Sequence, residues 1–230
     1  MSGSLTDPMT RTWPQIELVT TQGVFELDGG KWEVTNNIWL VGDESEVLVI
    51  DAAHDPGTIA AAVAGRRVRA IVLTHGHNDH INAAVGLRDR VDAPVFLHPD
   101  DRMLWDAVHP REAPDRQLAE GQMFEVAGAQ LRVLHTPGHS PGCCCLLLAR
   151  SEGPGAPVVF SGDTLFCGGP GATGRSYSDQ PTILESIRQR LLSLPAETVV
   201  HTGHGESTTL GAEAPRIREM IEAQGDAHRS

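Results

Sequence analysis

Short runs of apolar and β-branched residues recur along this chain, separated by segments with helical spacing. Such runs are typical of strands when turn residues bound them, and those that are apolar throughout are typical of strands buried on both faces. The predicted strands are residues 37–41, 46–50, 68–73, 93–97, 130–134, 143–148, 157–160 and 197–200. Strands alternating with helices predict an α/β fold with a mixed sheet.

The clearest helix signal lies at residues 55–65. Asp55 suits the N-cap, Pro56 suits the first turn and Gly65 suits the end. Further segments have helical spacing, and these are residues 79–90, 99–108, 180–194 and 211–224. Residues 1–12 resemble a flexible tail, and the lack of a linker or repeat in the rest predicts a single domain over 13–230.

The composition disfavours several classes of protein. The 30 acidic and 18 basic residues give a formal charge of -12 without any Lys/Arg cluster, which argues against nucleic acid as a partner. No apolar run approaches the roughly 18 residues of a membrane span, and the N-terminus lacks a signal-like apolar segment. We therefore expect a cytoplasmic protein without membrane association. The cysteines, Cys143, Cys144, Cys145 and Cys167, fit neither a disulfide framework nor a C-x-x-C zinc pattern.

Metal-ligating side chains follow the ends of five predicted strands. The stretch THGHNDH, residues 74–80, comes directly after strand 68–73, and Asp51 closes strand 46–50. The other three strands deliver His139, Asp163 and His204 within a few residues of their ends. In α/β sheets, ligands lie beyond the carboxyl ends of strands, so we expect these side chains to converge.

The number of these ligands indicates metal ions. Five histidines and two aspartates exceed what nucleophilic or acid–base catalysis requires. They also exceed one four-coordinate site but fit two metal ions that share a carboxylate. The ligand types favour zinc, with iron and manganese as alternatives. The isolated residues His98, His109 and His135 are better explained as capped turns or half-exposed rings.

Four motifs, THGHNDH, HTPGHSPG, FSGDTLFCGG and TGHG, resemble in sequence and order those of the metallo-β-lactamase superfamily, over about residues 37–206. The second and third look most like the glyoxalase II group, the hydroxyacylglutathione hydrolases. The resemblance implies a four-layer αββα sandwich of two mixed β-sheets. It assigns His75, His77 and His139 to one metal ion, Asp79, His80 and His204 to a second, and Asp163 as the bridge between them. Asp51 would support the site through hydrogen bonds.

The resemblance also implies a substrate site. In glyoxalase II proteins a basic residue, and a tyrosine two positions later, contact the thiol carrier; Arg175 and Tyr177 stand in similar order, with an ordinary exposed loop as the alternative. Asn82 replaces a glycine that the family commonly has. For His54 a helix-capping or solvent role is favoured. The short C-terminal end favours a thiol other than glutathione, and mycothiol is one candidate.

The implied activity is that of a metal-dependent hydrolase that cleaves a thioester of a small thiol. Two cations would lower the pKa of a bridging water from about 15.7 toward about 7 and so supply hydroxide at neutral pH. Asp79 would orient this hydroxide as well as bind metal, and Asp163 would hold both ions, so these two are the expected catalytic residues. A thiolate leaving group needs little help from an acid.

Three alternatives remain open. Persulfide dioxygenases of the superfamily use one iron ion, held by the residues that correspond to His75, His139 and Asp163. Lactonase and β-lactamase activities share the same metal core. A non-catalytic metal module is disfavoured because structural zinc sites usually have four protein ligands, often cysteines.

Overall fold

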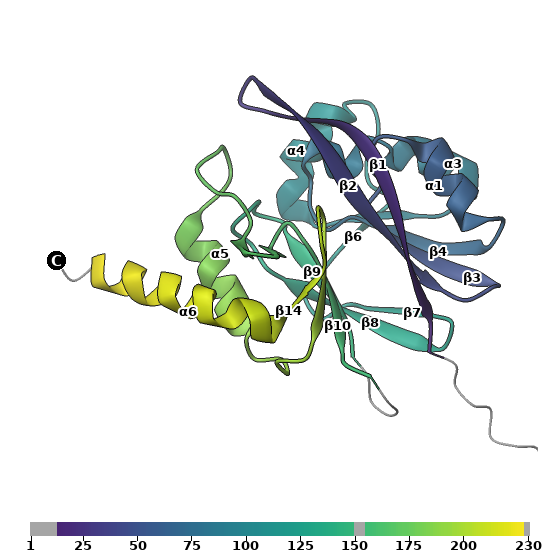
Figure 1. Ribbon diagram of the computed structural model, residues 1–230. Coiled ribbons are helices and arrows are strands. Elements are labelled where there is room, and N and C mark those ends of the chain that lie inside the picture. The colour runs from purple at the N-terminus through teal and green to yellow at the C-terminus, as the bar shows by residue number, and fades with distance from the viewer. Residues whose placement is uncertain (1–12, 150–154, 228–230) are drawn as a thin grey trace, which may run out of the picture.

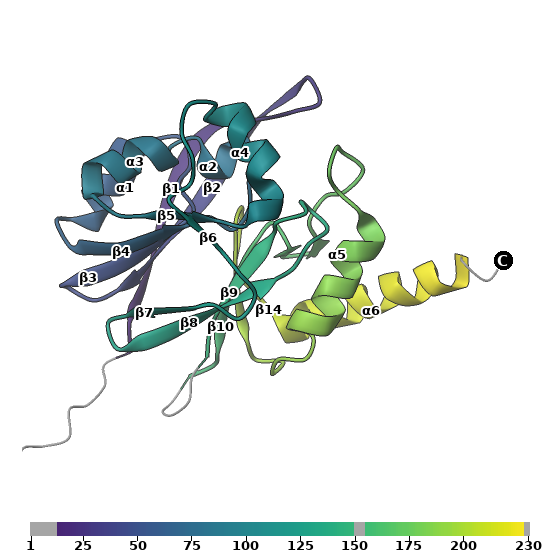
Figure 2. The same cartoon turned by 180° about the vertical axis from the view of Figure 1, so that it is seen from behind.

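The computed structural model describes residues 13–149 and 155–227, so the predicted tail at 1–12 lies outside the described part (Figure 1). Two mixed β-sheets pack face to face, and helices cover the outer face of each (Figures 1 and 2). This four-layer α/β sandwich confirms the predicted fold class. Within the described part, no helix is long and apolar enough to cross a membrane.

The first sheet has the order β1-β2-β3-β4-β5-β6, antiparallel from β1 to β3 and parallel from β3 to β6. Its strands are β1 (Gln15–Leu27), β2 (Gly30–Gly42), β3 (Glu46–Ile50), β4 (Arg67–Val72), β5 (Val95–Leu97) and β6 (Arg116–Gln117). The helices of this half are α1 (Pro56–Val63), α2 (Asn78–Ile81), α3 (Ala84–Val91), η1 (Pro99–Asp101) and α4 (Arg102–Val108).

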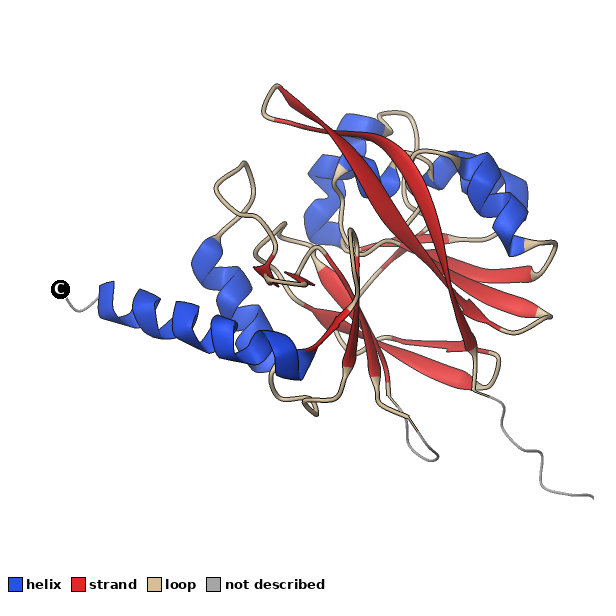
Figure 3. Cartoon of the chain, in the orientation of Figure 1, coloured by secondary structure: helices blue, strands red, loops and turns tan. Residues whose placement is uncertain are grey.

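The second sheet has the order β14-β13-β10-β9-β8-β7, in which only β10 and β13 are parallel neighbours. Its strands are β7 (Met123–Val126), β8 (Ala129–His135), β9 (Cys144–Leu148), β10 (Val158–Gly162), β13 (Val199–Thr202) and β14 (Thr208–Thr209). A short pair, β11 (Leu165–Phe166) and β12 (Gly169–Pro170), follows β10. The helices are α5 (Gln180–Ser186), the π-helical turn η2 (Ile187–Leu191) and α6 (Leu210–Ala227), and Figure 3 shows how they flank the strands.

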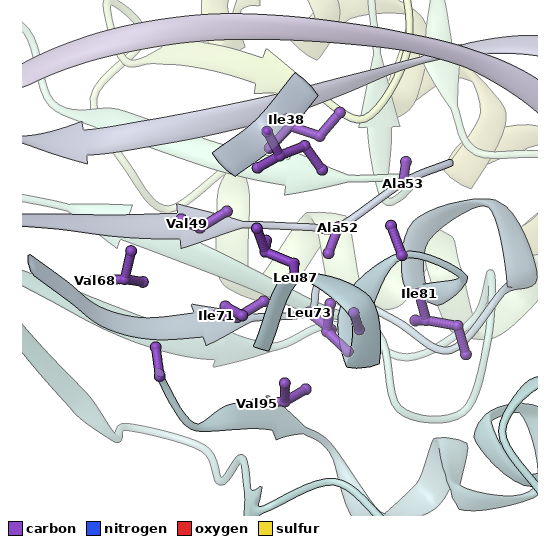
Figure 4. Close-up of a cluster of buried hydrophobic side chains, with 14 of the residues drawn as sticks. Ile38, Val49, Ala52, Ala53, Val68, Ile71, Leu73, Ile81, Leu87 and Val95 are labelled. Carbon is purple, nitrogen blue, oxygen red and sulfur yellow. The ribbon is translucent and has the colours of Figure 1, made fainter. Parts of the chain in front are cut away.

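Successive side chains on the strands point to opposite faces of each sheet and form three apolar layers. In β2, Ile38, which is labelled in Figure 4, and Leu40 face the helices of the first half, whereas Trp39 and Val41 face the second sheet. In the same way, Cys144 lies between the sheets and Cys145 faces α5 and α6. Strands buried on both faces explain why the sequence shows continuous apolar runs.

Helix α1 begins as the sequence predicts. The Asp55 carboxylate accepts hydrogen bonds from the backbone N–H groups of Gly57 and Thr58, at 2.8 and 3.1 Å, and Pro56 occupies the first turn. The helix ends at Val63, and the next two residues, Ala64 and Gly65, both have positive φ.

Two features of the first half differ from the prediction. The helix expected over 79–90 is divided into α2 and α3 at Asn82 and Ala83. Strand β1 and the first half of β2 were not predicted at all, because their side chains alternate between partly buried and exposed and include many polar residues. Together β1 and β2 form a long hairpin at one edge of the first sheet.

Replacing the capping carboxylate tests the start of α1. Asp55→Ala removes the acceptor for two N–H groups, and we expect it to lower the free energy of unfolding by about 1 kcal/mol, measured by urea denaturation. Asp55→Asn, which can still cap, should restore most of the loss. Glu44→Ala, at an exposed turn, is the control and should change stability by less than about 0.5 kcal/mol. Equal losses in Asp55→Ala and Glu44→Ala would contradict the cap.

Candidate metal centre

The predicted ligands converge at one edge of the sandwich. His75 and His77 follow β4, Asp79 and His80 lie in α2, and the remaining three residues follow β8, β10 and β13. These three strands run in the same direction, so their carboxyl ends meet at one edge. All seven side chains are buried except that of His204, which is partly exposed.

His75, His77 and His139 form a first cluster. Nδ1 of His77 lies 3.0 Å from Nε2 of His75 and 3.0 Å from Nε2 of His139. The third pair of rings is edge-on, with centroids 5.0 Å apart. Burial lowers the pKa of His77 to about 3, so at neutral pH its ring is uncharged and offers a lone pair.

Asp79, His80 and His204 form a second cluster. The Nε2 atoms of His80 and His204 lie 3.1 Å apart, and Oδ2 of Asp79 lies 3.6 and 3.3 Å from them. The one-turn helix α2 carries Asp79 and His80, while His204 arrives from the second sheet. Both sheets therefore contribute to this cluster.

Asp163 lies between the two clusters. Its Oδ2 atom is 3.4 Å from Nε2 of His139 in the first cluster and 3.5 Å from Nε2 of His204 in the second. Its Oδ1 atom is 3.3 Å from Nε2 of His80 and, among the described residues, has no hydrogen-bond partner. A single carboxylate thus faces both groups of imidazoles.

The outward nitrogens of the rings define where the lone pairs point. In His80, His139 and His204, Nδ1 lies 2.8–2.9 Å from an oxygen that can only accept. These oxygens are the Asp51 carboxylate for His80 and the carbonyls of Ala172 and Thr35 for His139 and His204. The proton of each neutral ring is therefore on Nδ1, and the Nε2 lone pair points into the site.

The carboxylates make the second cluster favourable for positive charge. Although burial opposes it, Asp163 and Asp79 raise the pKa of His204 to about 10 and that of His80 well above its ordinary value. Burial acts to raise the pKa of Asp79, but His80, His204 and Asn36 outweigh it and lower that pKa to about 2. Two imidazolium rings with Nε2 atoms 3.1 Å apart would repel each other. A divalent cation among these atoms satisfies the carboxylates without that repulsion.

Asp51 supports α2 and the loop that follows β4. Its carboxylate accepts hydrogen bonds from the Thr74 backbone N–H at 2.7 Å, from the Thr74 hydroxyl at 2.9 Å and from Nδ1 of His80 at 2.9 Å. Since that hydroxyl donates to Asp51, it accepts from Nδ1 of His75 at 3.1 Å. Asp51 therefore orients one histidine of each cluster, directly or through Thr74.

Two further residues that support the ligands, Asn36 and Asp101, were not predicted from the sequence. Asn36 donates from Nδ2 to Oδ2 of Asp79 at 3.0 Å, from within a strand that carries no recognisable motif. The buried Asp101 accepts from the backbone N–H groups of Gly76 and Gly142 and from the Ser140 hydroxyl, at 2.6–2.7 Å. Asp101 joins the loops that hold His75 and His139. Its only sequence signal was an acidic pair at a helix start.

The loop with Arg175 and Tyr177 contacts the β1–β2 hairpin. The Arg175 guanidinium lies 3.7 Å from the centre of the Trp32 ring and 5.7 Å from that of Phe25. The Phe25 ring packs edge-on against His77, with centroids 5.2 Å apart. Tyr177 is 54% exposed and has φ of 69°. Arg175 is thus connected to the first cluster through a single aromatic ring.

His98, Asp100 and His135 form a separate group that could offer metal ligands. However, the His98 and His135 rings stack face to face with centroids 4.1 Å apart, and Nδ1 of His98 accepts the Asp100 backbone N–H at 3.3 Å. The expected role of His98 as a capping residue agrees with these contacts.

The chain matches a known protein family. The family model of the metallo-beta-lactamase superfamily matches residues 32–204. The chain belongs to this superfamily. It is 32% identical over 196 residues to the hydroxyacylglutathione hydrolase GloC of Haemophilus influenzae, covering 76% of this chain and 87% of that protein. This similarity agrees with a glyoxalase II-like branch.

Solved structures support the same placement. TTHA1623 in a di-iron-bound form superposes with a TM-score of 0.67 at 38% identity, covering 79% of this chain and 93% of that chain. The BLEG-1 B3 metallo-beta-lactamase superposes with a TM-score of 0.69 at 28% identity, covering 86% and 97%. The superfamily hydrolase assignment thus rests on sequence, fold and the His/Asp clusters together.

Removal of the Asp101 carboxylate tests its role as a support. Asp101→Ala leaves two buried N–H groups and one hydroxyl without their acceptor, and we expect a loss of about 2–4 kcal/mol in the free energy of unfolding of the metal-free protein, measured with urea. Asp100→Ala is the matched control. The Asp100 carboxylate is largely exposed, and it lies 3.7 Å from Nδ1 of His98. Similar small losses in both variants would contradict this role.

Proposed function

We propose that this protein is a binuclear metal-dependent hydrolase that cleaves a thioester of a small thiol. The observation that carries the proposal is the position of Asp163, whose carboxylate faces His139 of one cluster and both histidines of the other at 3.3–3.5 Å. A site for one ion would not require both clusters. Two ions that share a carboxylate account for every inward-facing ligand atom.

The residues fit divalent metal ions. In the first cluster, Nδ1 of His77 lies 3.0 Å from Nε2 of His75 and 3.0 Å from Nε2 of His139. In the second cluster, the Nε2 atoms of His80 and His204 lie 3.1 Å apart. Imidazole and carboxylate donors suit zinc, which we propose, and also iron. His75, His77 and His139 would hold one ion, and Asp79, His80 and His204 the other, with Asp163 shared.

The bound ions would supply a nucleophile from water at neutral pH and polarise the carbonyl of the substrate. The chain supplies orientation. Asp79 is fixed by Asn36 and lies at the second cluster, where it can accept a hydrogen bond from the attacking hydroxide and so orient it. Phe25 shields His77 from one side and so restricts the access of solvent to the first cluster.

Arg175 and Tyr177 are proposed to bind the thiol part of the substrate. The guanidinium of Arg175 lies over the face of the Trp32 ring, a contact that orients its charge without neutralising it. The Asp28 carboxylate accepts the Ser176 backbone N–H at 2.9 Å and so fixes the loop to the hairpin tip. Similarity to GloC, a hydroxyacylglutathione hydrolase, supports a thioester as the substrate class.

Hydrolysis of a β-lactam or lactone is the second candidate. The BLEG-1 enzyme, a B3 metallo-beta-lactamase, covers 86% of this chain in structure, and the same clusters could act on a ring carbonyl. A thioester is favoured because its thiolate leaves without the help of an acid. Direct comparison of thioester, lactone and β-lactam substrates distinguishes these activities.

Metal content and activity test the proposal together. The purified protein should contain two metal ions per chain, and removal with a chelator should abolish thioester hydrolysis until metal is restored. Asp163→Ala should lower kcat by about a thousandfold, because the metal ions contribute several kcal/mol to transition-state stabilisation. The far-ultraviolet circular dichroism should stay that of the native fold.

A different outcome would select another function. One iron ion per chain with O₂ consumption on a persulfide would replace the hydrolase with a dioxygenase that uses His75, His139 and Asp163. Unfolding of His75→Ala with no hydrolysis by the native protein would indicate a structural metal module. The control is Glu44→Ala, an exposed residue outside both clusters, which should keep its metal content and activity.

Substitution of Arg175 tests the substrate site. Arg175→Ala should raise KM about tenfold for a thioester whose thiol part carries a carboxylate, with kcat changed less than about twofold, because a contact equal in ground and transition states affects only binding. Arg188→Ala, an exposed arginine of η2 paired with Glu185, is the control. A fall in kcat at constant KM would contradict the assignment.

A further inference from the structure

A chain of side-chain hydrogen bonds extends from the second cluster to His54 and Asn82. Asn36 donates to Asp79 at 3.0 Å, and its Oδ1 atom lies 2.9 Å from Nε2 of His54. Nδ1 of His54 lies 3.0 Å from Nδ2 of Asn82. The sequence suggested a helix cap or a solvated side chain for His54. Its ring instead bonds to Asn36 and Asn82.

The backbone N–H of His54 determines which group donates and which accepts in each of these hydrogen bonds. The N–H of His54 donates to Oδ1 of Asn82 at 2.6 Å, and since a backbone N–H can only donate, the Asn82 amide has a single orientation. Its NH₂ group must then donate to Nδ1 of His54. Burial lowers the pKa of His54, so the neutral ring carries its proton on Nε2 and donates it to Asn36.

The same logic fixes the amide of Asn36. Because its oxygen accepts from His54, its NH₂ group faces Oδ2 of Asp79 and also lies 3.3 and 3.4 Å from Nε2 of His80 and His204. If the amide were reversed, its oxygen would face the Asp79 carboxylate and repel it. The orientation of Asn36 thus decides whether Asp79 is held among the other ligands of its cluster.

The backbone around His54 is built to seat this ring. His54 has φ of 59°, which is uncommon for a residue other than glycine. A Cβ atom on Gly23 of β1 would lie 2.1 Å from Nδ1 of His54, so only glycine leaves room for the ring there. Asn82, which bonds to both the backbone and the ring of His54, lies between α2 and α3.

We infer that His54 and Asn82 are positioning residues which, through Asn36, hold Asp79 and so set the affinity of the second cluster for its metal ion. Among the described residues, the first cluster, His75, His77 and His139, makes no hydrogen bond to Asn36, His54 or Asn82, so its metal affinity should change little. The inference rests on the proposed function, because it presupposes a metal ion at the second cluster.

Stepwise metal binding by the metal-free protein tests the inference. Co²⁺ is titrated while its visible absorption is recorded, and Zn²⁺ is titrated in competition with a chromophoric chelator. His54→Phe keeps the ring shape without its nitrogens, and we expect it to weaken the second binding step by about 10- to 100-fold while the first changes less than about twofold. His54→Gln, which can accept from Asn82 and donate to Asn36, should restore most of the affinity.

A double-mutant cycle separates positioning from general destabilisation. Asn36→Ala should weaken the second step at least as much as His54→Phe, and His54→Phe should have no further effect in the Asn36→Ala background. Arg188→Ala, an exposed arginine of η2 paired with Glu185, is the control and should leave both steps unchanged. If His54→Phe fails to fold, Asn82→Ala serves in its place in the same cycle.

The outcomes are distinct. Equal weakening of both steps, additive effects in the cycle, or an unchanged second step would overturn the inference, provided that the unsubstituted protein binds two ions. If the unsubstituted protein binds only one ion, the binuclear proposal fails first, and the inference fails with it.

Discussion

The rest of the structure depends on one constraint, the confinement of five imidazoles and two carboxylates in a space that is largely buried. Buried polar groups are costly unless they are paired, and here the inward-facing nitrogens face one another at 3.0–3.1 Å. Hydrogen bonds to the other atoms of the ligands reduce this cost. The outward nitrogens of His80, His139 and His204 make such bonds to Asp51 and two backbone carbonyls, whereas Nε2 of His77 has no hydrogen-bond partner among the described residues. The lone pairs are thereby left for metal ions.

The sandwich makes this confinement feasible because its two sheets present their strand ends at the same edge. Alternating side chains such as Trp39 and Val41 fix the distance between the sheets by filling the central layer. Trp39 also donates from Nε1 to the Thr202 carbonyl at 3.0 Å, which ties β2 to the strand that leads to His204. Packing between the sheets is thus part of the geometry of the second cluster.

The sequence predicted the fold class and the gathering of the ligands because both leave local signals. Buried strands appear as apolar runs, and each ligand follows such a run within a few residues. The supporting groups leave no local signal, since Asn36 and Asp79 are 43 residues apart and Asp101 reaches Gly142 across 41 residues. The β1–β2 hairpin was missed for another reason. Its residues are half-exposed on an edge, so their pattern is too polar to be distinguished from a loop.

The two clusters differ in how their ligands are supported by hydrogen bonds. In the first cluster, His75 and His139 bond to Thr74 and to a backbone carbonyl, which are elements of the loops themselves. In the second, Asp79 depends on an amide whose orientation is imposed by two side chains outside the ligand motif. A substitution at His54 or Asn82 therefore changes one cluster without altering any ligand. On our proposal, two proteins with the same seven ligands would differ in their affinity for metal at the second cluster if these supporting residues differed, and the ligand motif alone would not reveal the difference.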